Sequence, residues 1–164
     1  IKMKQIICKS LDECQIVDTS IIKNILVPFD NSKHATRVFG YALTLAKIFD
    51  ANLLIAAITQ DDLQRSWVNG VPSRDKEMSK HSLVQLREGM NKLQHQANGL
   101  KIKVNSTIMT SKDIRATILS LIASQKIDLV IMGTRGRGEM KEMMLGRVST
   151  TIALNAGCPV MLIK

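Results

Sequence analysis

Unbroken apolar runs restrict the fold of this chain more than any other feature. Ile25-Leu26-Val27 and Leu129-Val130-Ile131-Met132 contain no polar residue. A strand with one face in water alternates apolar and polar residues, so unbroken runs indicate strands that are buried on both faces. Strands of this kind are typical of a parallel sheet covered by helices on both sides.

Segments with helical spacing lie between these runs. From Ala35 to Phe49, apolar residues recur every three or four positions, which predicts a helix with one buried face. The same spacing predicts helices at 83–97, 114–122 and 146–155, and further strands are expected at 53–58, 102–108 and 160–163. In the strand at 102–108, apolar residues alternate with polar ones, so this strand is expected near a sheet edge. The pattern predicts one α/β domain with an open five-stranded parallel sheet and helices on both faces.

The first twenty residues do not share this pattern. We interpret 1–20 as an N-terminal extension and 21–164 as the α/β domain. The extension has only a short strand-like patch, Gln5-Ile6-Ile7. We expect it to be partly mobile or to pair with another segment.

Cysteine usage and hydropathy bound the cellular setting. The chain has three cysteines, Cys8, Cys14 and Cys158. Their odd number and wide spacing argue against a disulfide framework or a zinc site, and favour a reducing, cytoplasmic setting. No secretory signal is visible, and no apolar run approaches the ~20 residues that cross a bilayer. We therefore expect no membrane partner.

The formal net charge of +9 raises the prospect of an anionic partner. The basic residues are spread along the chain, and the nearest approach to a cluster is Arg135, Arg137, Lys141 and Arg147. Aromatic residues make up only 3% of the chain. Stacking on nucleic-acid bases requires such residues, so nucleic-acid binding is disfavoured.

A glycine-rich basic segment follows the apolar run at 129–132. It begins Gly133-Thr134-Arg135-Gly136-Arg137-Gly138, and Gly146 then opens a predicted helix. Glycines let a backbone approach a ligand closely, and free N–H groups at a helix start attract phosphate. The spacing is neither G-x-G-x-x-G nor a Walker P-loop. The alternative is a loop whose glycines serve only left-handed turns.

Asp30 follows the first strand of the predicted sheet and is a candidate acceptor for ribose hydroxyls. In an open parallel sheet, ligands bind beyond the carboxyl ends of the strands, where the strand order reverses. Asp30 and the glycine segment are therefore expected to face the same ligand.

Three separated segments together resemble the universal stress protein family. They are Ile25-Leu26-Val27-Pro28-Phe29-Asp30-Asn31-Ser32, Asp128-Leu129-Val130-Ile131-Met132-Gly133-Thr134-Arg135-Gly136 and Gly157-Cys158-Pro159-Val160-Met161-Leu162-Ile163-Lys164. The resemblance covers residues 23–164. The nucleotide-binding branch of the family has the pattern Gly, two residues, Gly, nine residues, Gly, then Ser or Thr. Gly133, Gly136 and Gly146 match this spacing, whereas Arg147 occupies the hydroxyl position.

The resemblance implies specific roles for the residues of a nucleotide site. Asp30 would meet the ribose, Pro28 and Ile58 would flank the adenine, and the Met132-Gly133 backbone would lie near the base. The phosphates would be bound, mostly by backbone N–H groups, by Gly136, Gly146, Val148 and Ser149. Arg147 leaves two alternatives open: its guanidinium replaces the missing hydroxyl, or its bulk fills the phosphate space.

Other polar residues have less specific interpretations. Ser32 or Asp30 is expected to cap the first helix, and Ser111 the third. His34, His81 and His95 have no metal-like spacing, and we interpret His34 as a surface residue. Asp30, Asp113, Glu139 and Glu142 are available to hold Mg²⁺ with phosphate, but the sequence does not assign the metal ligand.

We predict a Rossmann-like domain with strand order 3-2-1-4-5. It is expected to bind ATP, or AMP or ADP, with Mg²⁺ as a candidate companion. The resemblance implies a stress-response role, as a nucleotide-dependent switch or interaction module, and a homodimer paired through the last strand. No catalytic base is evident, so we expect binding rather than enzymatic activity, with slow hydrolysis at most. The alternatives are a dimeric interaction module that has lost its nucleotide, a nucleic-acid binder and an ATP-hydrolysing enzyme.

Overall fold

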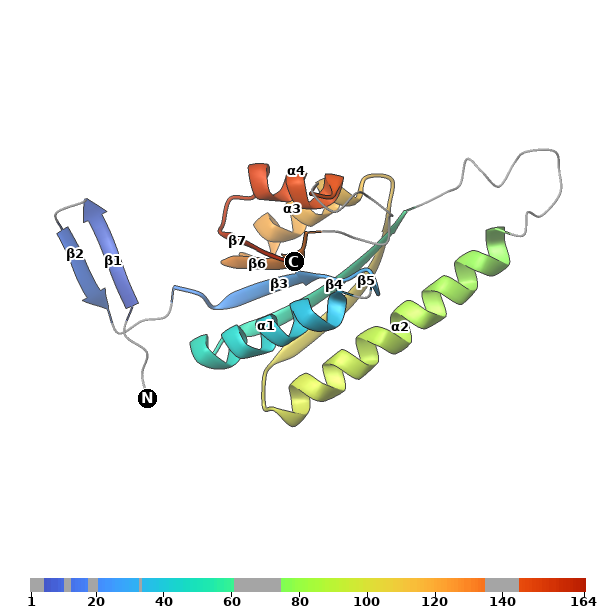
Figure 1. The fold of residues 1–164 in the computed structure, drawn as a ribbon, viewed down its shortest axis with the longest axis horizontal. Helices are drawn as coiled ribbons and strands as arrows, with labels where there is room; N and C mark the ends of the chain where they lie inside the picture. The colour runs from blue at the N-terminus through green and yellow to red at the C-terminus, as the bar shows by residue number, and fades with distance from the viewer. Residues whose placement is uncertain (1–4, 11–12, 18–20, 33, 61–74, 135–144) are drawn as a thin grey trace.

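A computed structural model describes residues 5–10, 13–17, 21–32, 34–60, 75–134 and 145–164 (Figure 1). Its strands are β1 (Gln5–Ser10), β2 (Glu13–Val17), β3 (Asn24–Pro28), β4 (Asn52–Gln60), β5 (Val104–Ser111), β6 (Leu129–Gly133) and β7 (Val160–Ile163). Its helices are α1 (Ala35–Phe49), α2 (Asp75–Gly99), α3 (Ile114–Ser124) and α4 (Arg147–Asn155). No helix in these ranges is long and apolar enough to cross a membrane.

Five strands form a parallel sheet in the order β5-β4-β3-β6-β7. If β3 is counted as the first strand of the domain, this is the predicted order 3-2-1-4-5, and the prediction is confirmed. The chain moves outward from β3 through β4 to β5, then returns to the other side of β3 for β6 and β7. The strand order therefore reverses between β3 and β6.

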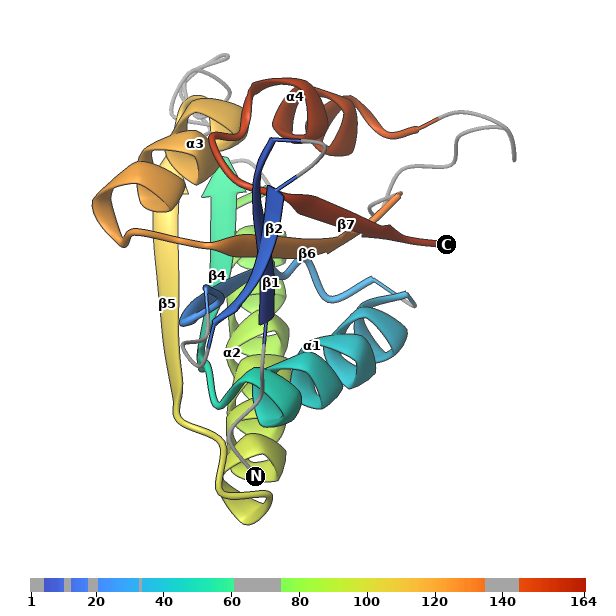
Figure 2. The same ribbon diagram turned by 90° about the vertical axis from the view of Figure 1, so that its left-hand side faces the viewer.

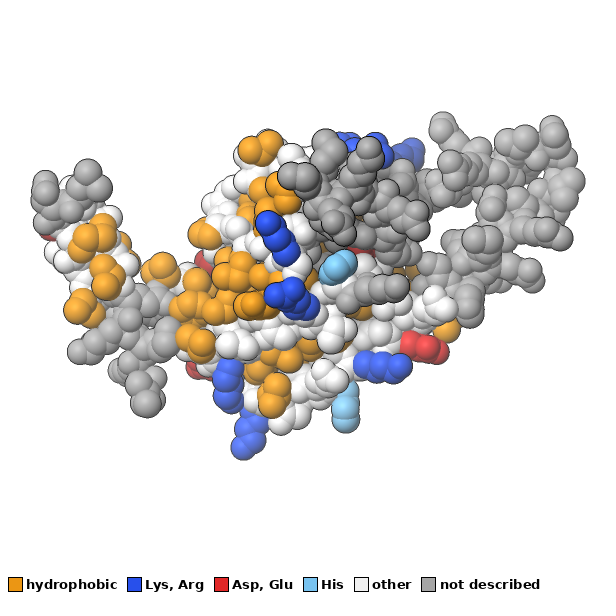
Figure 3. Space-filling view, viewed as in Figure 1, with side chains coloured by type: hydrophobic (Ala, Val, Ile, Leu, Met, Phe, Trp, Pro, Cys, Tyr) orange, Lys and Arg blue, Asp and Glu red, His pale blue; other side chains and the backbone are white. Residues whose placement is uncertain are grey.

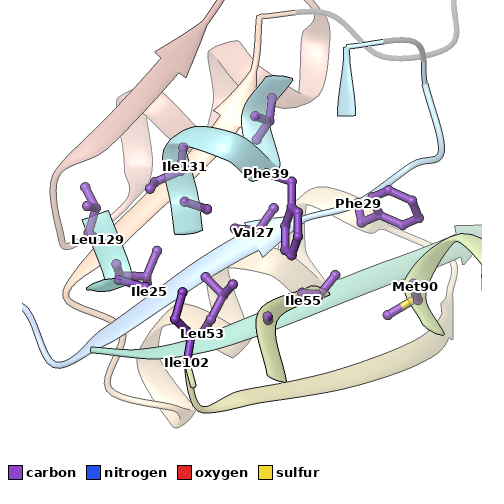
Figure 4. Close-up of a cluster of buried hydrophobic side chains, with 14 of the residues drawn as sticks. Ile25, Val27, Phe29, Phe39, Leu53, Ile55, Met90, Ile102, Leu129 and Ile131 are labelled. Carbon is purple, nitrogen blue, oxygen red and sulfur yellow. The ribbon is translucent and has the colours of Figure 1, made fainter. Parts of the chain in front are cut away.

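Helices cover both faces of the sheet, with α1 and α2 on one side and α3 and α4 on the other (Figure 2). Alternate residues of each central strand point to opposite layers because the side-chain period of a strand is two. Ile25 and Val27 pack in the layer of α1 and α2 (Figure 4), whereas Leu26 packs with α3 and α4. All three are almost fully buried. The prediction from the unbroken apolar runs is thus confirmed.

The predicted extension contains a β-hairpin in which β1 pairs with β2 in antiparallel orientation. It stands at one end of the molecule, separate from the large sheet (Figure 1). Hydrophobic side chains on it are exposed (Figure 3), including the cross-strand pair Ile6 and Ile16, each 66% exposed. The strand-like patch at Gln5-Ile6-Ile7 was therefore only the beginning of a longer element.

The hairpin overturns the interpretation of the cysteines. Cys8 lies opposite Cys14 in its register, and their sulfur atoms form a disulfide of 2.02 Å. The prediction against a disulfide was wrong because cysteine counting does not register that a tight hairpin brings residues six positions apart face to face. The number and spacing of the cysteines therefore no longer support a reducing compartment. Cys158 is the free thiol of the described chain.

The helix caps differ from the predictions. The N-cap of α1 is His34, which makes no capping side-chain bond, and the Asp30 carboxylate instead accepts from the Ser32 N–H at 3.0 Å. Asp113, not Ser111, caps α3. The expected edge strand is confirmed as β5, although it begins at Val104. The strand expected at 53–58 is longer in the structure, where β4 runs from Asn52 to Gln60.

Candidate functional site

A cavity of about 380 Å³ opens at the carboxyl ends of β3 and β6. This is the position where the strand order reverses, and open α/β sheets bind ligands there. Its volume lies within the ~300–1,000 Å³ of small-molecule pockets. The sheet order therefore accounts for the location of the cavity.

Nine of the ten residues predicted for the site line this cavity. They are Pro28, Asp30, Ile58, Met132, Gly133, Gly146, Arg147, Val148 and Ser149. The tenth, Gly136, lies outside the described ranges. The structure thus brings together residues from β3, β4, β6 and α4, while their roles toward a ligand remain predictions.

Other cavity residues were not predicted as site residues. They are Val27, Phe29, Ser32, Ala35, Val38, Ala56, Ile114 and Ile118. Ile114 and Ile118 belong to the helix predicted at 114–122 from its apolar spacing. Their place in the first two turns of a helix that follows the carboxyl end of β5 was the available signal. They make much of the cavity apolar, as a planar base requires.

The start of α4 is open toward the cavity. Its N-cap is Gly146, which has no side chain to accept from the first turn, and that turn contains no acidic residue. The first intrahelical bond runs from the Thr150 N–H to the Gly146 carbonyl at 2.9 Å. The N–H groups of Arg147, Val148 and Ser149 precede that bond and have no intrahelical acceptor. Together with the helix dipole, they favour an anion at this end.

A set of hydrogen bonds joins the end of β6 to the start of α4. The Thr134 carbonyl accepts from the Gly146 N–H at 2.8 Å and from the Ser149 hydroxyl at 3.1 Å. The same hydroxyl lies 3.1 Å from the Gly133 carbonyl. Ser149 is only 3% exposed, and its hydroxyl is occupied by these carbonyls. Its contribution to an anion would therefore come from its backbone N–H.

Asp30 contributes a carboxylate from the β3 side. It is half-buried, and its Oδ1 accepts from the Ser32 N–H in a tight turn. The next residue, Asn31, adopts a left-handed conformation with φ 58°, which asparagine tolerates better than most residues. Among the described residues, Oδ2 has no hydrogen-bond donor. It remains an acceptor for a ligand hydroxyl.

Arg147 is exposed and lies at the first helical position of α4. The ion pair found within the described ranges joins Arg115 to Asp113 at 3.3 Å, so Arg147 has no carboxylate partner there. His34 is exposed and does not line the cavity. The described part of the chain contains no group of three His, Cys, Asp or Glu residues that could hold a metal. Glu139 and Glu142 lie outside it.

Sequence comparison identifies the family. The model of the universal stress protein family matches residues 22–164. The chain belongs to this family. A universal stress protein of Methanocaldococcus jannaschii is 27% identical over 147 residues, which cover 88% of this chain and 84% of that protein.

Solved structures of universal stress proteins share the fold. The UspA protein of Lactobacillus plantarum matches 87% of this chain and 97% of its own, with a TM-score of 0.71 and 22% identity. A universal stress protein in complex with cAMP matches 88% and 99%, with a TM-score of 0.65 and 17% identity. One from Archaeoglobus fulgidus in complex with dAMP also matches 88% and 99%, with a TM-score of 0.62 and 16% identity. These similarities show that this universal stress protein has the same fold as those solved structures.

Proposed function

We propose that this universal stress protein binds an adenine nucleotide, principally ATP, in the cavity between β3 and α4. AMP and ADP are the alternatives. The nucleotide would switch a stress-response interaction module in the cytoplasm, where adenine nucleotides are concentrated. The observation that carries the proposal is that one cavity contains a hydroxyl acceptor, an apolar chamber and an uncapped helix start.

Each part of the cavity suits one part of a nucleotide. Ile58, Ile114 and Met132 offer apolar surface to the base. The Asp30 carboxylate is an acceptor for sugar hydroxyls. The first-turn N–H groups of α4 favour the phosphates. Two solved members of the family are complexes with cAMP and with dAMP, which supports the ligand class.

We assign Arg147 to phosphate binding. Its position at the start of α4 adds a full positive charge to the partial charge of the helix dipole. Its guanidinium also presents paired donors to phosphate oxygens. Because its side chain lacks a carboxylate partner among the described residues, no ion pair there would have to be broken.

Three variants test this assignment by calorimetry with ATP and AMP. Arg147→Ser should weaken ATP binding by about tenfold, because one charged hydrogen bond is lost. It should weaken AMP binding by less. Arg147→Lys should retain part of the affinity. Arg87→Ser, at an exposed position of α2 that does not line the cavity, removes the same charge and should change the affinities little. Tighter ATP binding by Arg147→Ser would show instead that the arginine fills the phosphate space.

The decisive experiment is identification of any nucleotide in protein purified without added ligand, followed by calorimetry with ATP, ADP and AMP. Each titration is repeated with and without Mg²⁺, which we propose accompanies the phosphates. Binding of ATP below millimolar concentration supports the proposal. No heat and no copurified nucleotide at millimolar ATP would reject it and favour the module that has lost its nucleotide.

Binding without turnover is part of the proposal. Its check is the release of ADP from saturating ATP over several hours, with an Asp30→Asn variant as the matched control. Release at background rate is expected. Multiple turnovers that depend on the cavity would make the protein an ATP-hydrolysing enzyme instead.

We further propose a homodimer through β7, an edge strand of the five-stranded sheet. Edge strands are normally covered, because their unpaired N–H and C=O groups invite pairing. Met161 on β7 is 36% exposed, and Leu154 on neighbouring α4 is 79% exposed. Light scattering at micromolar concentration should give the mass of a dimer, and Met161→Lys should reduce it. A monomer mass for the unmodified protein contradicts this proposal.

A further inference from the structure

Helix α2 meets the loop after β3 through a glycine. A Cβ built on Gly89 would lie 3.0 Å from Asn31 Oδ1, 3.2 Å from Phe29 Cζ and 3.4 Å from Phe29 Cε1. Carbon atoms in good contact are about 3.5–4.0 Å apart. Any side chain at this position would therefore press on the loop, and glycine permits the close approach.

The two residues that meet Gly89 are the neighbours of Asp30 on either side. Phe29 is 7% exposed and packs in the same apolar cluster as Met90, the residue after Gly89 (Figure 4). Asn31 is held at φ 58°. The cavity-lining carboxylate therefore lies between two residues that both rest on α2.

A second helical glycine shows that this arrangement is specific. Gly40 lies in α1, and a Cβ built on it meets nothing within 4 Å. Glycine weakens a helix interior relative to alanine, so both helices would gain intrinsic stability from alanine. Only at Gly89 does a contact oppose that gain. The pair thus supplies a test position and a matched control.

We propose that Gly89 is a positioning residue for Asp30. It seats α2 against Phe29 and Asn31 and thereby fixes the carboxylate where the sugar hydroxyls of a nucleotide lie. An added methyl group requires the Asn31 and Phe29 side chains to give by a few tenths of an ångström. Because Asp30 lies between these two residues in the chain, its carboxylate then shifts away from the sugar hydroxyls. This inference rests on the proposed nucleotide binding and adds to it the element that sets recognition of the sugar.

The first test compares ATP with 2′,3′-dideoxy-ATP, which lacks the sugar hydroxyls. Gly89→Ala should weaken binding of ATP by about fivefold and binding of the dideoxy nucleotide by less than about twofold. A misplaced Asp30 carboxylate affects only a nucleotide whose sugar hydroxyls contact it. Gly40→Ala should leave both affinities unchanged. An equal loss for both nucleotides in Gly89→Ala would overturn the inference, because it would indicate general damage. An unchanged ATP affinity would overturn it as well.

A double-mutant cycle tests whether Gly89 acts through Asp30. Adding Gly89→Ala to Asp30→Asn should cause no further loss of ATP affinity, whereas additive losses would show an independent effect. Asn31→Gly keeps the left-handed turn and removes the closest atom that the methyl group meets. In the Gly89→Ala background it should restore part of the ATP preference. Failure to restore any would contradict the inference.

The outcomes separate this inference from the proposed function. If the unmodified protein binds no ATP, the proposed function fails and the inference fails with it. If the unmodified protein binds ATP and prefers it to the dideoxy form, but Gly89→Ala keeps the same preference, only the inference fails. Circular dichroism spectra of all variants verify that the helix content of the protein is unchanged.

Discussion

Helices α3 and α4 are neighbours that begin differently at the same edge of the sheet. They pack on the same face, contact each other, and both contribute residues to the cavity. Asp113 caps α3, and its Oδ1 accepts from the N–H groups of Arg115 at 2.9 Å and Ala116 at 3.3 Å. Gly146 begins α4 and supplies no side-chain acceptor.

The charge at the two helix starts follows this difference. Hydrogen bonding from the Ala116 N–H, followed by that from the Arg115 side chain, holds the pKa of the Asp113 carboxyl below its ordinary value. The negative charge of the Asp113 carboxylate thus offsets the partial positive charge at the start of α3. At α4 the residue next to the cap is Arg147, so its full positive charge adds to the partial positive charge of the helix dipole. A helix that caps itself cannot also offer its first turn to a ligand, and α4 alone of the two remains available.

The largest expected effects concern the buried side chains through which both helices pack against the sheet. Ile118 of α3 and Ile152 of α4 are 2% and 0% exposed. Replacing either with alanine should lower the free energy of unfolding by about 2–5 kcal/mol, because each leaves a cavity in the same cluster. Urea denaturation measures this. A much smaller loss for Ile152→Ala would mean that α4 is loosely held, and that the helices differ in more than their caps.

The next largest effect is expected from a substitution that gives α4 an acidic cap like that of α3. Gly146 has φ −63° and ψ 149°, which aspartate adopts without strain. Gly146→Asp should cap α4 and place a negative charge in the cavity, weakening ATP binding by about a hundredfold while stabilising the helix. Calorimetry and thermal unfolding measure the two effects.

Gly157→Asp, in open space between α4 and β7, is the matched control for charge. It should leave ATP affinity nearly unchanged. If Gly146→Asp bound ATP as well as the unmodified protein, the open start of α4 would have no part in phosphate binding.

A smaller effect is expected at the bonds that hold α4 to β6. Ser149→Ala removes the hydroxyl that serves the Gly133 and Thr134 carbonyls. It should cost about 1–3 kcal/mol of stability, since the hydroxyl is buried. Thr151→Ala, whose hydroxyl bonds only within the helix to the Arg147 carbonyl, should cost less. Equal losses in denaturation would show that the bonds to β6 do not stabilise the structure specifically.

The smallest effect is the pH dependence of the α3 cap. Because the folded-state pKa of Asp113 is lowered, its contribution to stability is present above the ordinary pKa of 3.8 and is lost as the pH falls below that value. Asp113→Asn should therefore reduce the difference in stability between neutral pH and pH below 3.8. Thermal unfolding across that range measures the change. An identical pH dependence in the variant would remove Asp113 as its source.

Much of the fold was predictable because its signals are local. The unbroken run at 129–132 predicted β6 within one residue of its end, and the spacing from Ala35 to Phe49 predicted α1. The caps were less predictable. Asp30, Ser32, Ser111 and Asp113 are all chemically competent caps, and the turn geometry of the folded chain selected among them.

The same limit explains the cysteines and the cavity. Cys8 and Cys14 meet through the register of a hairpin that short-range periodicity did not reveal. The apolar residues of α3 were recognisable as buried, but a hydrophobic pattern does not distinguish a wall of packed core from the wall of a cavity. Only the arrangement of α3 against β3 and β6 makes that distinction.

The sequence by itself determined the order of strands and helices, the burial of the sheet on both faces, and a glycine spacing that resembles the nucleotide-binding pattern of the family. These properties depend on periodicity and on residues close in the chain. The tertiary structure decided that the uncapped start of α4 lines the same cavity as Asp30, that the Ser149 hydroxyl bonds to the end of β6, and that Gly89 lies against Phe29 and Asn31. Such contacts join segments far apart in sequence, and only the packing of the whole domain sets their distances.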